Sequence, residues 1–101
     1  MADNVVDGNV KARIIAMTAG ESYQINFDQR VRYVNVRKVG SGTIAIGVDK
    51  ELTDINDDTA FTIDDDAPAY GPIEKDGNDC IGYLYAISDA AVNLEFKTVT
   101  N

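Results

Sequence analysis

The chain has no histidine and no tryptophan, and Cys80 is the single cysteine among its 101 residues. Without histidine, no Ser-His-Asp triad and no imidazole-ligated metal site can form, and a lone cysteine makes no disulfide within the chain. Cys80 also has no histidine to activate it as a nucleophile. The sequence therefore predicts a protein that is not an enzyme, without catalytic residues, metal ligands or cofactors.

Long apolar runs are missing too, since no window approaches the 18 residues of a membrane-spanning helix. The first eight residues have neither a basic region nor an apolar core, so we expect no signal peptide. A single cysteine suits a reducing cytoplasm. Nine basic against 17 acidic residues give a net charge of −8, and this excess repels nucleic-acid phosphates and anionic membranes. We expect no nucleic-acid partner and no membrane.

The acidic residues are concentrated between Asp49 and Asp79. That stretch contains eleven acids opposed only by Lys50 and Lys75, so it carries −9 while the rest of the chain carries +1. A solvated face of acidic loops is one interpretation. Calcium binding by residues 49–66, or docking of a basic partner, is the other. The spacing resembles a calcium loop only faintly, because Thr59 stands where that loop needs glycine.

Apolar and polar residues alternate through almost the whole chain, which is typical of half-buried β-strands. In the first such segment, Val10, Ala12, Ile14 and Ala16 share one parity. The alternating segments are Val10–Ala16, Tyr23–Phe27, Val31–Val39, Ile44–Val48, Phe61–Ile63, Ile81–Ile87 and Val92–Phe96. Their spacing predicts an all-β fold: a single antiparallel β-sandwich, jelly-roll-like, with about seven to eight short strands.

Turn residues suggest how the strands are connected. Gly40-Ser41-Gly42 predicts a tight hairpin, because glycine supplies the positive φ of primed turns. Residues 66–79 contain both prolines and predict a long loop. Residues 1–8 are expected to form a flexible N-terminal arm, and residues 9–101 the sandwich domain.

A basic segment precedes this glycine turn. Arg30, Arg32, Arg37 and Lys38 are four of the nine basic residues and lie within nine positions. They indicate either a solvated edge strand protected by charge, or a surface that docks on an acidic partner such as the acidic loops of a neighbouring copy. Arg32 and Lys38 share the parity of the strand's valines, which predicts a β-bulge or a strand covered on both faces.

The segment Ile81–Ile87 is apolar on both parities. It is therefore either a central strand covered on both faces beneath the long loop, or a strand that meets another subunit. Tyrosine is enriched at protein interfaces. The predicted partner-binding residues are accordingly Arg30, Arg32, Arg37, Lys38, Tyr83 and Tyr85.

Two stretches, residues 31–46 (VRYVNVRKVGSGTIAI) and residues 80–94 (CIGYLYAISDAAVNL), carry a resemblance. They resemble strands of small virion proteins of tailed bacteriophages, the capsid decoration and head-fibre-like proteins. In those proteins one strand reads V-x-N-x-G-S-G-x-I-x-V and a later one I-x-Y-x-I-S-x-x-A-x-V-x-L. The resemblance implies a β-sandwich that trimerises on the capsid and cements adjacent capsomers, with no catalytic residues.

On this basis the expected function is that of a non-enzymatic virion structural protein, a capsid decoration or cement protein that binds and stabilises the assembled phage head. Its partners would be the major capsid protein or another virion protein, and further copies of itself, with a homotrimer favoured. It would be assembled in the host cytoplasm and reside on the capsid surface of the virion. The alternatives are a carbohydrate- or calcium-binding β-sandwich module, and a tail or neck component of a phage virion.

Overall fold

A computed structural model describes residues 2–75 and 80–100 of the chain. These ranges contain eight strands and no helix, so the all-β prediction is confirmed. No helix in them is long and apolar enough to cross a membrane. The strands are β1 (Asn4–Asp7), β2 (Ala12–Met17), β3 (Ser22–Val39), β4 (Ile44–Val48), β5 (Phe61–Ile63), β6 (Ala69–Ile73), β7 (Ile81–Ser88) and β8 (Val92–Thr100).

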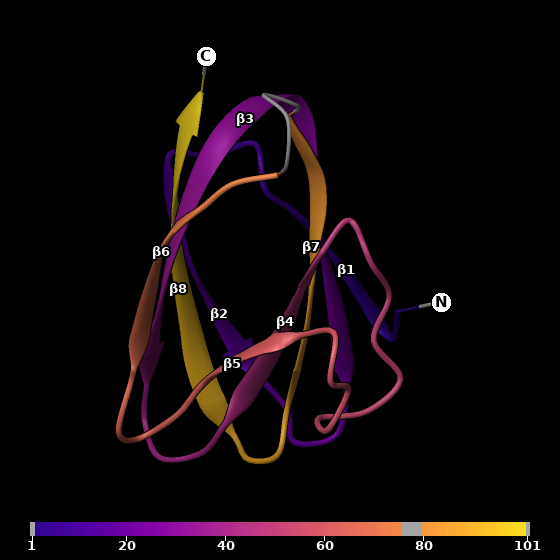
Figure 1. The fold of residues 1–101 in the computed structure, drawn as a ribbon, viewed down its shortest axis with the longest axis vertical. Helices are drawn as coiled ribbons and strands as arrows, with labels where there is room; N and C mark the ends of the chain where they lie inside the picture. The colour runs from indigo at the N-terminus through magenta and orange to yellow at the C-terminus, as the bar shows by residue number, and fades with distance from the viewer. Residues whose placement is uncertain (1, 76–79, 101) are drawn as a thin grey trace.

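The 18-residue strand β3 organises the fold. Its first half pairs with β7 on one side and, in parallel, with β1 on the other, while its second half pairs with β8 and β6. Figure 1 shows β3 arching from the side of β1 and β7 to the side of β6 and β8. The sequence predicted separate strands at Tyr23–Phe27 and Val31–Val39, and this is wrong, because the backbone continues as strand through residues 28–30 between them.

All eight strands consequently belong to one mixed sheet that curls on itself, in the order β2-β8-β3-β7-β4-β5 with β1 and β6 alongside β3. The described pairings among β2 to β8 are antiparallel, as predicted for residues 9–101, and the parallel pairing of β1 with β3 makes the sheet mixed. Two separate layers, as in a sandwich, are not confirmed, because β3 links both halves of the sheet.

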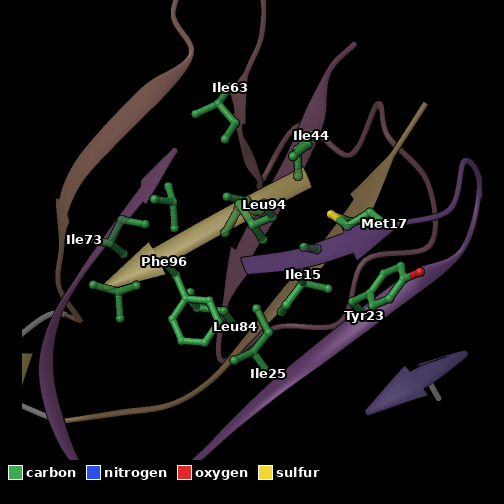
Figure 2. Close-up of a cluster of buried hydrophobic side chains, with 14 of the residues drawn as sticks. Ile15, Met17, Tyr23, Ile25, Ile44, Ile63, Ile73, Leu84, Leu94 and Phe96 are labelled. Carbon is green, nitrogen blue, oxygen red and sulfur yellow. The ribbon is translucent and has the colours of Figure 1, made fainter. Parts of the chain in front are cut away.

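The inward faces of the curled sheet enclose the main hydrophobic core. Phe96, Ile25 and Leu84 are completely buried there, with 0% of each residue exposed. Figure 2 shows side chains from strands on both sides of the curl pointing toward one another in this core. Burying aliphatic and aromatic side chains of this size, at roughly 1.5–3 kcal/mol each, is the main contribution that holds the two sides of the curl together.

A second, smaller cluster lies on the opposite face of β4 and β7. Tyr85, Ile87 and Ala45 are buried there together with Leu52, which comes from the loop of residues 49–60. The strand β7 is thus covered on both faces, as its apolar sequence predicted. Leu52, Ile55 and Ala60 of the loop of residues 49–60 cover this face, which the sequence had assigned to the proline-containing segment.

Two predicted connections differ from the structure. Gly40-Ser41-Gly42 does not close a hairpin, because β3 and β4 are not neighbours in the sheet. The positive φ angles of Gly40 (115°) and Gly42 (141°) instead let the chain cross from one half of the sheet to the other. Residues 66–79 were expected to be a loop, but Ala69–Ile73 form β6 along the edge of β3. Residues 76–79 of that predicted loop lie outside the described part of the chain.

The strand β2 faces the core with the parity opposite to that indicated by its alternation. Ile15 and Met17 are buried, whereas Ala12, Ile14 and Ala16 point outward and are exposed. Each face of β2 offers one isoleucine, so this register buries Met17 in place of the small side chains of Ala12 and Ala16. It leaves Ile14 with 59% of its surface exposed.

The predicted N-terminal arm contains a strand. Residues 4–7 form β1, which pairs with Tyr23–Asn26 of β3, and the carboxylate of Asp3 accepts hydrogen bonds from the backbone and hydroxyl of Ser22. These bonds attach the segment to the sheet. The division of the chain into residues 1–8 and 9–101 stays a prediction.

The bulge predicted in the basic segment is confirmed. Val31 lies opposite Thr100 and Tyr33 opposite Val99, so Arg32 is an extra residue in β3. After this bulge Val34, Val36 and Lys38 point inward, and the residues between them point outward. The bulge therefore determines which of the basic residues reach the surface.

Candidate functional site

The structure places Arg32, Arg37 and Lys38, three of the four basic residues of the predicted partner-binding segment, in different surroundings. Lys38 is turned inward, and only 3% of its side chain is exposed. Its ammonium donates hydrogen bonds to Asp65 Oδ1 at 2.5 Å and to the Gly40 carbonyl at 2.6 Å. These bonds hold the crossing between β3 and β4, so Lys38 is a structural residue in the free chain and is not available to a partner.

Arg37 is the most exposed of the three basic residues whose side chains are described in this segment. Its side chain is 58% exposed and lies 2.7 Å from the carboxylate of Glu95 on β8. Arg32, at the bulge, stacks over the ring of Tyr33, with 5.8 Å between the guanidinium carbon and the ring centroid. Arg30 lies in β3, but its side chain is outside the described part of the structure.

The two tyrosines predicted to bind a partner lie beneath or beside the loop of residues 49–60. Tyr85 is 2% exposed and its hydroxyl donates to Ser22 Oγ at 3.2 Å, so it is a core residue. Tyr83 is half-buried at the edge of the same cluster. Burial first, and then the nearby charges of Glu51 and Asp49, raise the pKa of Tyr83 above its ordinary value.

A shallow groove of about 360 Å³ lies on the outward face of β3, β6 and β8. Asn35 and Arg37 come from β3, Glu95 and Lys97 from β8, and Tyr70 from β6. Two positive charges and one negative charge lie here, on a chain whose net charge is −8. We call these five residues the groove face.

Tyr70 and Lys97 were not among the predicted site residues. Tyr70 is 52% exposed, and its ring stacks on Phe61 with 4.6 Å between the ring centroids. The outward position of Lys97 could be predicted, because the alternation of Val92–Phe96 assigns Lys97 to the outward face of its strand. The position of Tyr70 could not be predicted from the neighbouring residues in the sequence, because its segment was expected to be a loop.

The acidic loops use many of their carboxylates to order their own backbone. Asp54, Asp57 and Asp64 each accept a hydrogen bond from the backbone N–H two residues later, the pattern of an Asx turn. Asp49, at a positive φ of 51°, accepts from the N–H groups of Gly82 and Tyr83. Within the described ranges no three His, Cys, Asp or Glu residues are grouped so that they could hold a metal ion.

Two of these carboxylates have lowered pKa values. Hydrogen bonds from the hydroxyl and N–H of Thr59, together with the Lys50 ammonium, lower the pKa of Asp57 to about 2. The Lys38 ammonium and the Gly42 N–H lower the pKa of Asp65. Both carboxylates therefore stay ionised at neutral pH and act as fixed anchors for loops.

Comparisons with protein-family models, with curated proteins and with solved structures find no match to this chain.

Proposed function

We propose that this chain is a non-enzymatic virion structural protein that decorates the head of a tailed phage, where it binds the assembled shell and stabilises it. Its partner is the major capsid protein or another virion protein, and its location is the capsid surface, after assembly in the host cytoplasm. We also propose that the fold is a jelly-roll-like β-sandwich, in which the two sides of the curled sheet are the two layers.

The observation that carries the proposal is the contrast between the groove face and the rest of the chain. Arg37 and Lys97 present positive charge on a flat strand surface, whereas residues 49–79 carry −9. Complementary charge gives orientation and a fast association rate when a small protein docks on a large acidic surface. The carboxylates of Asp49, Asp57 and Asp65 accept hydrogen bonds from backbone N–H groups and so hold the loops in place. This further supports a structural role for them rather than a catalytic one.

Co-sedimentation with purified heads of the phage that encodes the chain tests this function. The double variant Arg37→Gln/Lys97→Gln removes two positive charges from the groove face, and Lys50→Gln/Lys75→Gln removes two from the acidic side. Both variants change the net charge equally, so a docking role predicts at least a tenfold loss of affinity for the first and less than a twofold change for the second. Absence of binding by the unmodified chain at micromolar concentration would refute the function.

Self-association is part of the proposal. The sequence favoured a homotrimer, and a closed ring of three would need a head-to-tail contact between two different surfaces of the chain. A tail or neck component would dock through the same groove face and differ only in its place in the virion, which immunogold labelling of intact particles would reveal.

Carbohydrate binding is a second candidate, and Tyr70 is the observation in its favour. An exposed tyrosine ring beside Asn35, Arg37 and Glu95 combines a stacking surface with planar hydrogen-bonding groups. A glycan array with the unmodified chain and Tyr70→Ala tests this candidate. Saturable binding that Tyr70→Ala abolishes would support it, and silence of the array would remove it.

A further inference from the structure

The outer edge of β2 is an open strand edge at one end of the curled sheet. The strand β2 lies at one end of the sheet order, beside β8. Among the described residues it has no strand on its other side. Arg13 shares the inward parity of Ile15 and Met17 yet is exposed, so the curl is open to solvent along this edge. Figure 2 shows Ile15 and Met17 of β2 among the buried side chains of the core.

The backbone groups that this edge presents can be assigned from two hydrogen bonds. The Lys11 carbonyl accepts from the N–H of Thr98, so the backbone groups of Lys11, Arg13 and Ile15 face β8. Because successive residues of an antiparallel ladder alternate, those of Ala12, Ile14 and Ala16 face the other way. In agreement, the Ala16 carbonyl accepts a bond from the Tyr23 hydroxyl at 3.5 Å rather than from β8.

The other outlying strands carry features that discourage edge pairing, and β2 does not. The strand β5 has three residues and is followed by Asp64, Asp65 and Asp66, and β6 contains Pro72. The strand β1 has four residues, follows Asp3 and ends at Asp7. Charge, proline and short length are the usual protections of a sheet edge. Six residues long, β2 has one charge, no proline and an isoleucine with 59% of its surface exposed.

We infer that β2 pairs antiparallel with β2 of a second copy of this chain, about a two-fold axis at Ile14. The outward-facing residues Ala12, Ile14 and Ala16 are symmetric about Ile14, so this axis places Ile14 opposite Ile14 and Ala12 opposite Ala16 of the second copy. The backbone groups of Ala12 and Ile14 and the N–H of Ala16 are then all used. The Ala16 carbonyl, which has two lone pairs, accepts from the second copy in addition to the Tyr23 hydroxyl. An axis one residue earlier would place Arg13 opposite Arg13, and like charges directly opposite are destabilising.

The neighbouring rows of side chains are compatible with this pairing. Lys97 lies opposite Ala12 and Asn93 opposite Ala16 on β8. The two-fold axis therefore puts Lys97 of one copy in the row of Asn93 of the other, and no like charges meet. The two Glu95 side chains share the central row but lie three strand spacings apart, about 14 Å, which exceeds the screening length of roughly 8 Å at physiological salt.

This contact is isologous and closes as a dimer, so it differs from the homotrimer favoured by the sequence, and it does not depend on the proposed function. Its salt dependence should also differ. Each copy carries −8, so higher ionic strength should strengthen edge pairing, whereas it should weaken docking of the groove face on an acidic shell.

Light scattering after size exclusion tests the inference with the full chain at tens to hundreds of micromolar. We expect twice the 11.0 kDa of one chain for the unmodified protein and a single-chain mass for Ile14→Lys, with at least a tenfold rise in the dimer dissociation constant. Ile14→Pro should act similarly, because that N–H faces away from β8. Val39→Lys, at an exposed site (45%) away from the β2 edge, is the control and should stay dimeric.

Cross-linking tests the register. In a Cys80→Ser background, Ile14→Cys should form a disulfide-linked dimer on mild oxidation, because directly opposite Cα atoms of such a pair are about 5.5 Å apart. Val39→Cys should not. A single-chain mass for the unmodified protein would overturn the inference. So would a trimer or dimer that persists in Ile14→Lys, or a dimer that Ile14→Cys fails to cross-link.

Discussion

Replacing Leu52 by alanine tests whether the loop of residues 49–60 is a packed part of the fold. Leu52 is 2% exposed and packs with Tyr85, Ile87 and Ala45 on the face of the sheet opposite the main core. The change removes three buried carbon groups, at about 0.8 kcal/mol each, so lost transfer energy alone is about 2.4 kcal/mol. A residual cavity adds to this, although a loop can collapse more readily than a strand. We expect a loss of about 2.5–3 kcal/mol.

Urea unfolding followed by far-UV circular dichroism measures this loss, because a single domain of this length is expected to unfold in one cooperative step. For a domain of this size the melting temperature should fall by roughly 10–20 °C. Val39→Ala is the matched control, since Val39 is 45% exposed, and its effect should stay within about 0.5 kcal/mol. A Leu52→Ala loss below about 1 kcal/mol would refute the packed loop, and Tyr85 and Ile87 would then be available to a partner.

Three further predictions concern the N-terminal segment and the acidic loops. Gly8→Ala should cost about 1–3 kcal/mol by thermal unfolding, because a Cβ there would lie 2.5 Å from the ring of buried Phe27, and a neutral result would contradict that packing. The pKa of Asp57 is about 2 when folded against 3.8 as its ordinary value, so its stabilising effect is present above about pH 3.8 and is lost as the pH falls toward 2. The difference in melting temperature between Asp57→Asn and the unmodified chain should therefore shrink over that range, and a constant difference would contradict the role of Thr59. Millimolar calcium, compared with chelator, should leave the melting temperature unchanged, and a rise would indicate a calcium site in residues 49–66.

Much of the local structure follows from alternation of residue types. The segments Ile44–Val48, Phe61–Ile63 and Ile81–Ile87 form strands where the sequence placed them, because each pattern is set by its own residues. The burial of Ile81–Ile87 on both faces also followed from its sequence. What alternation could not supply was the partner of each strand, since most pairings join segments far apart in the chain, such as Val31 with Thr100.

The errors at Gly40-Ser41-Gly42 and at Lys38 have this same non-local cause. A glycine turn indicates that the chain changes direction, but not whether the next strand pairs with the previous one. Lys38 is buried because Asp65, 27 residues later, reaches its ammonium, and no local pattern contains that contact. In β2 the local pattern allowed either face to be buried, and the structure buries the face of Ile15 and Met17.

The candidate site could be predicted only in part. Arg37 was identified by charge alone, and its position at the surface depends on the bulge at Arg32. Tyr85 was chosen because tyrosine is common at interfaces, but the loop of residues 49–60 covers it. Tyr70 reaches the groove face only because residues 69–73 form β6 along the edge of β3.

The most direct test of the proposed function is the temperature at which purified phage heads disrupt, measured with increasing amounts of this chain. A protein that binds the assembled shell and not its separated subunits stabilises the shell by mass action. We therefore predict that the disruption temperature rises with added protein and then saturates, and that Arg37→Gln/Lys97→Gln requires at least ten times more protein for the same rise. A disruption temperature that stays constant up to saturating micromolar concentrations would contradict the role of a capsid-stabilising protein.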